Sequence, residues 1–397
     1  MNKLFTTLLA GALFASFTAT AQDEAVEATE ESSSSAPLEF SGSIDTYYRT
    51  TLNTKDNGTS AAPRTSFADG TGFNIGMINL IASKEGEKAG FVADLVFGPR
   101  GDAAVFNAVN AGGNPANAAI VNQLYAYWNV SDKVTLTAGN FNTFLGYEVI
   151  SPTANFNYST SYAFSYGPFS HTGLKADFAL SDKLSAALAV MNPTDATTTT
   201  TVNSATFGAQ VGYTADKGGA WLNFLYGDQD GNIDGDDAKT AASALSSNGA
   251  TFQVDLTTGW DLTDAVYVGF NGTINTTFEG ESYDSTGADL EIVDYKAPSF
   301  YAAGVYFQYA LSDAFAVGLR GEYFSESNGG AGAIGTYATD GSANVIDLTL
   351  SANYTVGGLT FIPEFRLDAT SEDSFTDKDG NATSSLMSVA LAAVYAF

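Results

Sequence analysis

Cysteine is absent from this chain of 397 residues, positive charge is scarce, and long hydrophobic runs are missing. Without cysteine there is no disulfide and no lipid-modified cysteine, so hydrogen bonds and packing must stabilise the fold. No run of 18 apolar residues occurs, which excludes a transmembrane helix. The 44 Asp and Glu residues outnumber the 16 Lys and Arg residues, and the formal net charge is −28. Nucleic acid is excluded as a partner, because its recognition requires a basic face.

Histidine is nearly absent as well, since His171 is the single one. Zinc sites combine several His or Cys ligands, and the chain has no H-E-x-x-H motif. No motif for a positioned nucleophile accompanies His171 either. We therefore predict that the protein is not an enzyme, and that His171 is a packed or hydrogen-bonded strand residue rather than a catalytic base.

The abundant residue types favour a sheet with one face in lipid. Aromatic residues make up 13% of the chain, glycine occurs 40 times, and charged residues make up only 15%. Outer-membrane barrels carry an apolar outer band flanked by aromatic residues. A soluble helical enzyme fits this composition poorly.

The first 38 residues are predicted to lie outside the folded domain. Lys3, an apolar stretch over residues 4–17 and the small residues Ala19-Thr20-Ala21 form the pattern of a signal peptide, residues 1–21. Residues 22–38 are acidic and serine-rich, so they cannot bury enough apolar area to fold. We predict a disordered periplasmic tail there, with partner binding as the alternative. The transmembrane β-barrel domain is predicted to cover residues 39–397.

Alternation of apolar and polar residues indicates strands. Residues 344–354 place Ile346 and Leu348 on one face and Asp347 and Thr349 on the other. A spanning strand of a barrel has about 9–11 residues with this period of two. The same alternation recurs in residues 252–262, 301–311 and 359–368.

Short polar turns and long polar loops give the number of strands. The short turns are predicted at residues 84–89, 131–133, 181–183, 215–219, 263–264, 312–313 and 357–358. Longer stretches rich in Asn, Asp, Gly, Thr and Ser separate them, which is the asymmetry of outer-membrane barrels. We predict an all-β, antiparallel transmembrane barrel of 16 strands. The strands begin near residues 40, 72, 90, 119, 134, 169, 184, 204, 220, 249, 265, 298, 314, 343, 359 and 384.

The C-terminal strand carries a second signal. Phe397 ends the chain, and Tyr395 and Leu391 lie on the same face of an alternating strand. A terminal aromatic residue on such a strand looks like the signal that the barrel assembly machinery reads. We therefore expect this machinery to be a partner through the Phe397 strand.

Two sequence blocks carry a resemblance to a known family. Residues 140–150 read NFNTFLGYEVI, and residues 168–173 read PFSHTG, with Ser151-Pro152 and residues 155–158 between them. Together these blocks resemble the OmpL-like β-barrel porins, most sharply over residues 120–180. The resemblance implies an outer-membrane porin, in a family whose solutes are largely uncharacterised.

Charged strand residues are expected to face the lumen, because Arg or Lys on the lipid face near mid-membrane costs about 2–4 kcal/mol. The alternation sends these basic side chains inward: Arg49, Arg100, Lys175, Arg320 and Arg366. It sends these acidic side chains inward: Asp45, Asp94, Asp177, Asp255, Glu322, Asp347, Glu364 and Asp368. Two interpretations stay open. The charges either keep a water-filled wall soluble or form an electrostatic filter.

The third long loop, residues 142–167, is rich in Phe and Tyr, and Glu148 is its only charged residue. Long ordered loops are usually functional, and this composition argues against disorder. The loop at this position folds into the lumen of general porins, and the resemblance suggests the same here. We predict that it forms the constriction, with Glu148 near the pore axis facing a basic wall of Arg49, Arg320 and Arg366. The alternative is an outward aromatic cap over the barrel mouth.

One acidic loop segment matches the start of a calcium-binding loop. Asp230, Asn232 and Asp234 stand at ligand positions 1, 3 and 5, Gly235 stands at position 6, and Asp236 follows. The usual Glu at position 12 is missing, because Ala241 stands there. Calcium is one interpretation, and turn chemistry in a solvated loop is the other. Otherwise no cofactor is expected.

These observations predict a porin of the bacterial outer membrane that lets small polar solutes and ions diffuse through a water-filled barrel. Its partners would be outer-membrane lipids, the solutes and, since the outer face is apolar, further copies in a homo-oligomer. The alternative is a structural or adhesive barrel whose long acidic loops bind an external ligand.

Overall fold

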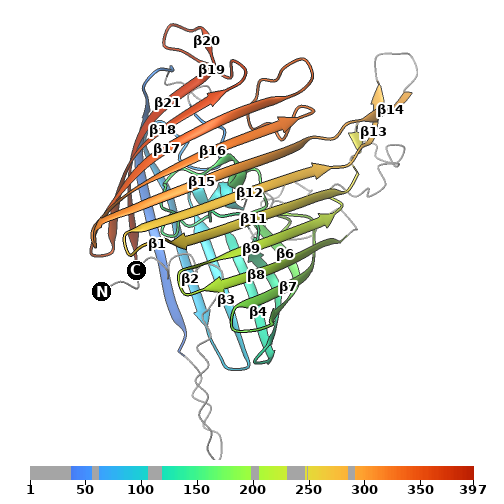
Figure 1. Ribbon diagram of the computed structural model, residues 1–397, viewed down its shortest axis with the longest axis vertical. Coiled ribbons are helices and arrows are strands. Elements are labelled where there is room, and N and C mark those ends of the chain that lie inside the picture. Colours follow the sequence, from blue (N-terminus) through green and yellow to red (C-terminus); the bar gives the residue numbers. More distant parts are fainter. Residues whose placement is uncertain are drawn as a thin grey trace, which may run out of the picture.

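The alternating segments form sixteen strands that close into one antiparallel barrel in the computed structural model (Figure 1). The structure describes residues 37–55, 62–105, 119–197, 205–229, 246–247, 249–284 and 291–397. The strands of the first half are β1 (Glu39–Thr51), β2 (Gly72–Lys84), β3 (Ala89–Phe97), β4 (Val121–Ser131), β5 (Val134–Asn142), β6 (Ser170–Ala179), β7 (Leu184–Met191) and β8 (Thr206–Ala215). Those of the second half are β9 (Gly218–Gly227), β11 (Thr251–Asp261), β12 (Val266–Thr277), β15 (Ser299–Ser312), β16 (Phe315–Ser327), β17 (Ala343–Val356), β18 (Leu359–Thr370) and β21 (Ser385–Ala396).

The predicted number of strands is confirmed, and the first strand pairs with the last. Each observed strand begins within two residues of its predicted start. Strands β1 and β21 pair antiparallel from Ser43 opposite Ala396 to Thr51 opposite Ser388. Gly42 and Phe397 exchange both backbone hydrogen bonds at 3.0 Å, so the pairing extends to the last residue. Closure leaves no unpaired edge strand, as a lipid environment requires.

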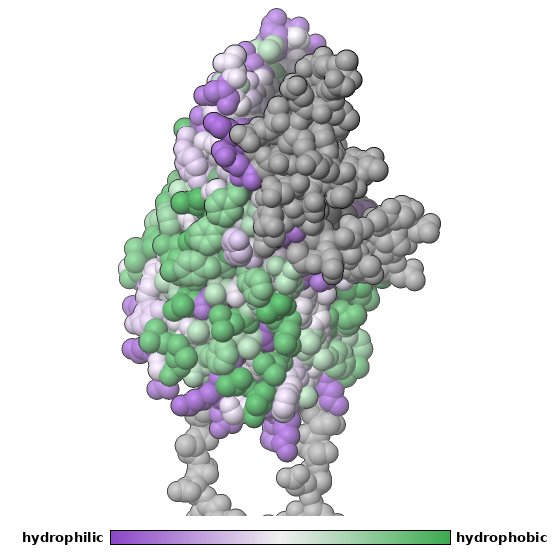
Figure 2. All heavy atoms as spheres, turned by 90° about the vertical axis from the view of Figure 1, so that its right-hand side faces the viewer, coloured by the Kyte–Doolittle hydropathy of each residue, from purple (hydrophilic) through white to green (hydrophobic). Residues whose placement is uncertain are grey.

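The two faces of the strands separate as the alternation predicted. Ile346, Leu348 and Leu350 of β17 are 43–53% exposed on the outside, whereas Asp347 and Thr349 are fully buried inside. Figure 2 shows hydrophobic residues forming a broad band around the strands, with hydrophilic residues gathered toward both ends. This band is the surface that meets lipid acyl chains.

The connections are short at one end of the barrel and long at the other, and the C-terminus lies at the short-turn end (Figure 1). Small elements occur within the loops: the helices α2 (Pro99–Ala104) and α3 (Tyr162–Ser165), and the short strands β10 (Ser246–Ser247), β13 (Gly280–Asp284), β14 (Glu291–Tyr295), β19 (Phe375–Thr376) and β20 (Ala382–Thr383). Among the described residues, neither helix is long and apolar enough to cross a membrane. The predicted signal peptide, nearly all of the acidic tail and the predicted calcium ligands lie outside the described residues.

Candidate functional site: the lumen and the third loop

The connection between β5 and β6, residues 143–169 and hereafter the third loop, folds into the barrel. Its residues Tyr158, Thr160 and Tyr162 are at most 1% exposed. Helix α3 forms a single turn within it, and the Ser161 hydroxyl caps this turn by accepting a hydrogen bond from the Phe164 amide. The inward fold is confirmed, and an outward aromatic cap is not what the loop forms.

Carboxylates of the barrel wall bind the backbone of the third loop. An irregular segment has amides without sheet partners, and buried amides need acceptors. Glu322 of β16 accepts hydrogen bonds from the Tyr162 and Ala163 amides, both at 2.7 Å. Glu364 of β18 accepts from the Tyr158 amide at 2.8 Å and from the Ser159 amide. Both glutamates, predicted as pore-lining residues, face the interior but serve as anchors of this loop.

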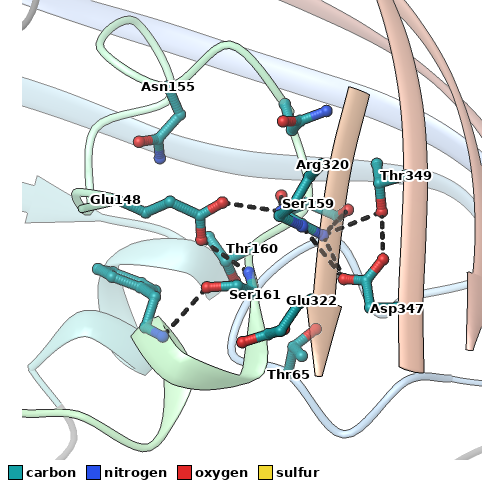
Figure 3. Close-up of polar contacts among 12 residues, drawn as sticks. Thr65, Glu148, Asn155, Ser159, Thr160, Ser161, Arg320, Glu322, Asp347 and Thr349 are labelled. Carbon is teal, nitrogen blue, oxygen red and sulfur yellow. Dashed lines mark hydrogen bonds and ion pairs between the residues drawn. The ribbon is translucent and has the colours of Figure 1, made fainter. Parts of the chain in front are cut away.

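Arg320 of β16 joins the third loop to the barrel wall (Figure 3). Its guanidinium pairs with Glu148 of the loop at 2.8 Å and with Asp347 of β17 at 2.7 Å. It also donates to the Ser159 carbonyl at 2.7 Å and to the Thr349 hydroxyl at 3.0 Å. Glu148 is thus in direct contact with Arg320, one of the arginines predicted to face this loop.

Arg366 of β18 extends the same ion-pair network. Its guanidinium lies 2.8 Å from Asp368 and 3.2 Å from Asp347, and it donates to the Thr160 carbonyl of the third loop at 2.8 Å. Asp347 therefore bridges Arg320 and Arg366. Removing these charges from water costs free energy, which ion pairing compensates only when the remaining hydrogen bonds are also made. Both arginines make such hydrogen bonds in addition to their ion pairs.

Arg49 and Arg100 both face the interior, but Arg100 does not lie on a strand. Arg49 of β1 donates to the Asp69 carbonyl at 3.1 Å. The prediction of Arg100 as a strand residue was wrong, because β3 ends at Phe97 and Gly98, with φ of 98°, turns the chain into α2. From this helix Arg100 donates to the Ile150 carbonyl at 2.9 Å and covers the Phe67 ring at 4.3 Å.

Lys175 lies apart from this network, on the other side of the lumen. It pairs with Asp177 of the same strand, β6, at 3.0 Å, and the two side chains are 22% and 23% exposed. Other interior-facing residues of β4 and β5, such as Gln123 and Thr135, are also only half-buried. The interior surface along β4–β6 is therefore accessible to water, whereas the wall from β16 to β1 is covered by the third loop.

The first residues of the third loop pack without charge against strands β7–β9. Phe144 and Leu145 form an apolar cluster with Met191 and Leu225. The Phe144 ring lies so close to Gly208 that a Cβ there would approach it to 2.5 Å. The Phe144 carbonyl accepts from Gln210 at 3.3 Å. The third loop thus meets strands β7–β9 through this apolar cluster, next to the water-accessible surface along β4–β6.

A cavity of about 620 Å³ lies on the loop side of that cluster. Leu225 belongs to both the cavity lining and the apolar cluster, so the cluster adjoins the cavity at this residue. The rest of the lining comes from loops, among them the third loop, and from loop-side ends of strands that include Thr251, Thr277 and Ser299. The cavity is thus a vestibule between the loops and the lumen.

Asp195, at the rim of this vestibule, is a titratable group outside the strands. It has φ of 62°, and its carboxyl accepts hydrogen bonds from the Phe169 and Ser170 amides at 2.7 and 2.9 Å. Burial raises the pKa of Asp195 to about 6, and the two amide hydrogen bonds partly oppose this rise. The group therefore gains its charge near neutral pH.

Because the folded-state pKa of Asp195 is raised, its favourable contribution is complete below its ordinary pKa of about 4 and is lost as the pH rises through about 6. We expect the wild-type barrel to lose up to about 3 kcal/mol of stability over this range relative to an Asp195→Asn variant, whose side chain stays neutral. The measurement is the thermal midpoint of both proteins in detergent from pH 4 to pH 7. Parallel curves for the two proteins would contradict the assignment.

His171 is a buried strand residue, as expected. Its ring lies 5.2 Å from the Phe144 ring, and its Nε2 is 3.0 Å from the Thr143 hydroxyl. Within the described part of the chain, no group of three or more His, Cys, Asp or Glu residues could hold a metal ion. The Asp377 carboxylate, for example, accepts hydrogen bonds from the Asp379 and Asn381 amides and closes a turn.

Several anchors of the third loop were not predicted as site residues. Asp45 of β1 accepts from the Tyr158 hydroxyl, and Asp255 of β11 accepts from the Gly146 amide at 2.9 Å. Their inward position followed from the alternation, but nothing local in the sequence showed that the loop would reach them. Glu326 accepts hydrogen bonds from the Ala333 and Ile334 amides in the loop after β16. It lies an even number of residues from Arg320 on the same strand, so the alternation would have placed it inside the barrel.

A family model described as "Putative beta-barrel porin-2, OmpL-like" matches residues 37–397, the bulk of the chain. No curated protein sequence matches the chain significantly.

Solved outer-membrane structures share the fold at low sequence identity. A loop L8 deletion mutant of OmpT, an outer membrane protein of Vibrio cholerae, is 11% identical with a TM-score of 0.53, and the match covers 91% of this chain and 99% of that chain. An anion-selective porin from Comamonas acidovorans gives the same identity, TM-score and coverage. OprB of Pseudomonas putida is 10% identical with a TM-score of 0.52, over 91% of this chain and 94% of that chain. At these identities the similarity concerns the fold alone.

Proposed function

Because the chain belongs to the OmpL-like family of β-barrel porins, we propose that it lets ions and small polar solutes diffuse passively through its lumen. The family and the closed barrel place the protein in the bacterial outer membrane. The observation that carries the proposal is the partly exposed Lys175–Asp177 pair inside the barrel, because it marks interior surface that stays wet beside the third loop. A sixteen-stranded barrel is wide enough to retain an aqueous path. An adhesive role for the loops has no comparable support.

Planar lipid bilayers provide the test of this proposal. Protein folded in detergent and added to a bilayer in KCl should produce stable, discrete current steps. Folding is checked separately by the altered gel mobility of an unheated barrel. A correctly folded protein that leaves the bilayer silent would contradict passive diffusion.

We expect weak cation selectivity, because inward carboxylates outnumber inward cations in the described strands. Lys175 and Asp177 provide the sharpest test, since both are partly exposed to the lumen. Lys175→Met should increase the cation preference and Asp177→Asn should decrease it, most clearly at low salt. Reversal potentials across a KCl gradient measure this, and equal potentials for the two variants would show that the pair does not face the ion path.

Two further partners belong to the proposal. The exposed Phe397 side chain ends the strand that closes the barrel, which suits recognition by the barrel assembly machinery. One of the similar solved structures is a trimer form of Vibrio cholerae OmpT, and we propose that the apolar outer face here also supports a homo-oligomer.

A further inference from the structure

The vestibule above the third loop has a lining unlike the ion-paired wall. Its volume of about 620 Å³ corresponds to roughly twenty water molecules and lies in the usual range of ligand sites. It is open on one side, and it is lined by the loop-side ends of β9, β11, β12 and β15, by parts of the third loop and by residues of other loops. Leu225 joins this lining to the apolar cluster of Phe144 and Leu145.

Amide and hydroxyl groups dominate one wall of the vestibule and are fixed by one another. Asn275 donates to Gln253 at 3.2 Å, Gln253 donates to Thr273 at 3.0 Å, and the Thr251 and Thr277 hydroxyls lie 3.0 Å apart. A hydroxyl donates once and accepts twice, so each pair keeps capacity for a ligand. No donor from the described residues reaches Oδ1 of Asn275, which lines the cavity. The wall is a preorganised set of neutral donors and acceptors.

Charge is scarce in the same place. Among the residues that the structure describes, Arg64 and Asp195 are the charged ones of the cavity lining. The next carboxylate along β11 is that of Asp255, and it already accepts hydrogen bonds within the protein. Its donors are Gly146 of the third loop and the side chains of Asn223, Thr257 and Asn271. A site for an anion would gather Lys and Arg, and a site for a cation would present free carboxylates. The vestibule does neither.

Aromatic residues complete the lining. Tyr166 and Phe169 of the third loop line the cavity, and so does Phe300 of β15, which is the cross-strand partner of Asn275. Aromatic faces are electron-rich, so they attract the polarised C–H groups on one face of a pyranose ring. A purely apolar ligand would leave the facing amides without partners, which is unfavourable. Hydroxyls on the ring edge and C–H groups on the ring face match the amide part and the aromatic part of this lining.

We propose that the vestibule is a binding site for a neutral sugar of one or two rings. Asn275 and the Thr251–Thr277 pair bind ring hydroxyls, and the aromatic side chains pack on the ring face. The site deepens the proposed function, on which it rests, by giving the porin a solute class that it concentrates above the lumen.

Saturation-transfer NMR on the detergent-folded protein tests the site without requiring an open channel. The probes are sucrose and glucose, with gluconate as a charged comparison. We expect saturation transfer to sucrose and glucose, at least a tenfold loss of sucrose affinity in Asn275→Leu, and no loss in Asn129→Leu. Asn129 is a matched control, since it is an amide on β4 that donates to the Glu87 carbonyl at the short-turn end.

Bilayer recordings separate this proposal from the function on which it rests. Sucrose added on the loop side should reduce the KCl current of the wild type more strongly than that of Asn275→Leu. A conducting barrel with no sugar signal by NMR overturns the sugar site and leaves the porin. A silent barrel that still binds sucrose overturns passive diffusion and leaves the site. Preferential binding of gluconate overturns the assignment of a neutral solute.

Discussion

Replacing Phe144 and Leu145 together with alanine is expected to raise the single-channel conductance severalfold. These residues form an apolar cluster with Met191 and Leu225, and Leu225 also lines the vestibule. Hydrophobic constrictions restrict conduction by excluding water. Removing both side chains beside the polar groups of Gln210 would leave space that water can fill.

Phe156→Ala is the matched control for this variant. Phe156 is also an aromatic residue of the third loop, and its ring packs closely on Gly318 of the covered wall. Its removal should leave the conductance near that of the wild type. If the double variant conducts like the wild type while its barrel remains folded, the ion path does not pass the apolar cluster.

Arg320→Met is expected to release the third loop from the barrel wall. The substitution leaves Glu148 buried without its cation and Asp347 with Arg366 alone, and a broken buried pair costs about 3–5 kcal/mol. Hydrogen exchange of the amides in residues 157–164 should accelerate by at least tenfold, and the channel current should become noisier. Mass spectrometry of exchanged peptides provides the measurement.

Two further variants keep the Arg320 prediction decisive. Lys175→Met removes an ion pair that is partly exposed and worth only about 0.2–1 kcal/mol, so exchange in the third loop should not change. Glu148→Gln preserves the shape of the side chain, and should give an intermediate acceleration even if Arg320→Met fails to fold. Unchanged exchange in both Arg320→Met and Glu148→Gln would show that other contacts hold the loop.

The barrel could be predicted from the sequence because its signals are local. Alternation of polar residues such as Asp347 and Thr349 with apolar residues indicates a strand. The position where this alternation stops indicates a turn. The loop-side and turn-side ends followed from the lengths of the connections. One local signal was misjudged: Gly98 and Pro99 end β3, and Arg100 therefore lies in α2.

The contacts of the lumen could not be predicted in the same way. Inward charges were identified by parity, but parity does not show which charge meets which. Arg320 was expected to face the third loop, but its direct bond to Glu148, 172 positions away in the sequence, could not be predicted. The choice of partner depends on how a 27-residue loop crosses the closed barrel, and that path is a property of the whole fold.

The separation of these partners along the chain has a consequence for how the protein assembles. Tyr158 contacts Asp45, 113 positions before it, and Glu364, 206 positions after it. Strand β1 can pair with β21 only after the C-terminal strand has reached the membrane, because Gly42 pairs with Phe397. Contacts of such high sequence separation form slowly and late. A chain interrupted before β16 would lack Arg320, Glu322 and Glu364, and so would expose both an open sheet edge and an unanchored aromatic loop. Proteases that survey unfinished chains could recognise either one, so the same residues that fill the finished barrel also distinguish it from an incomplete one.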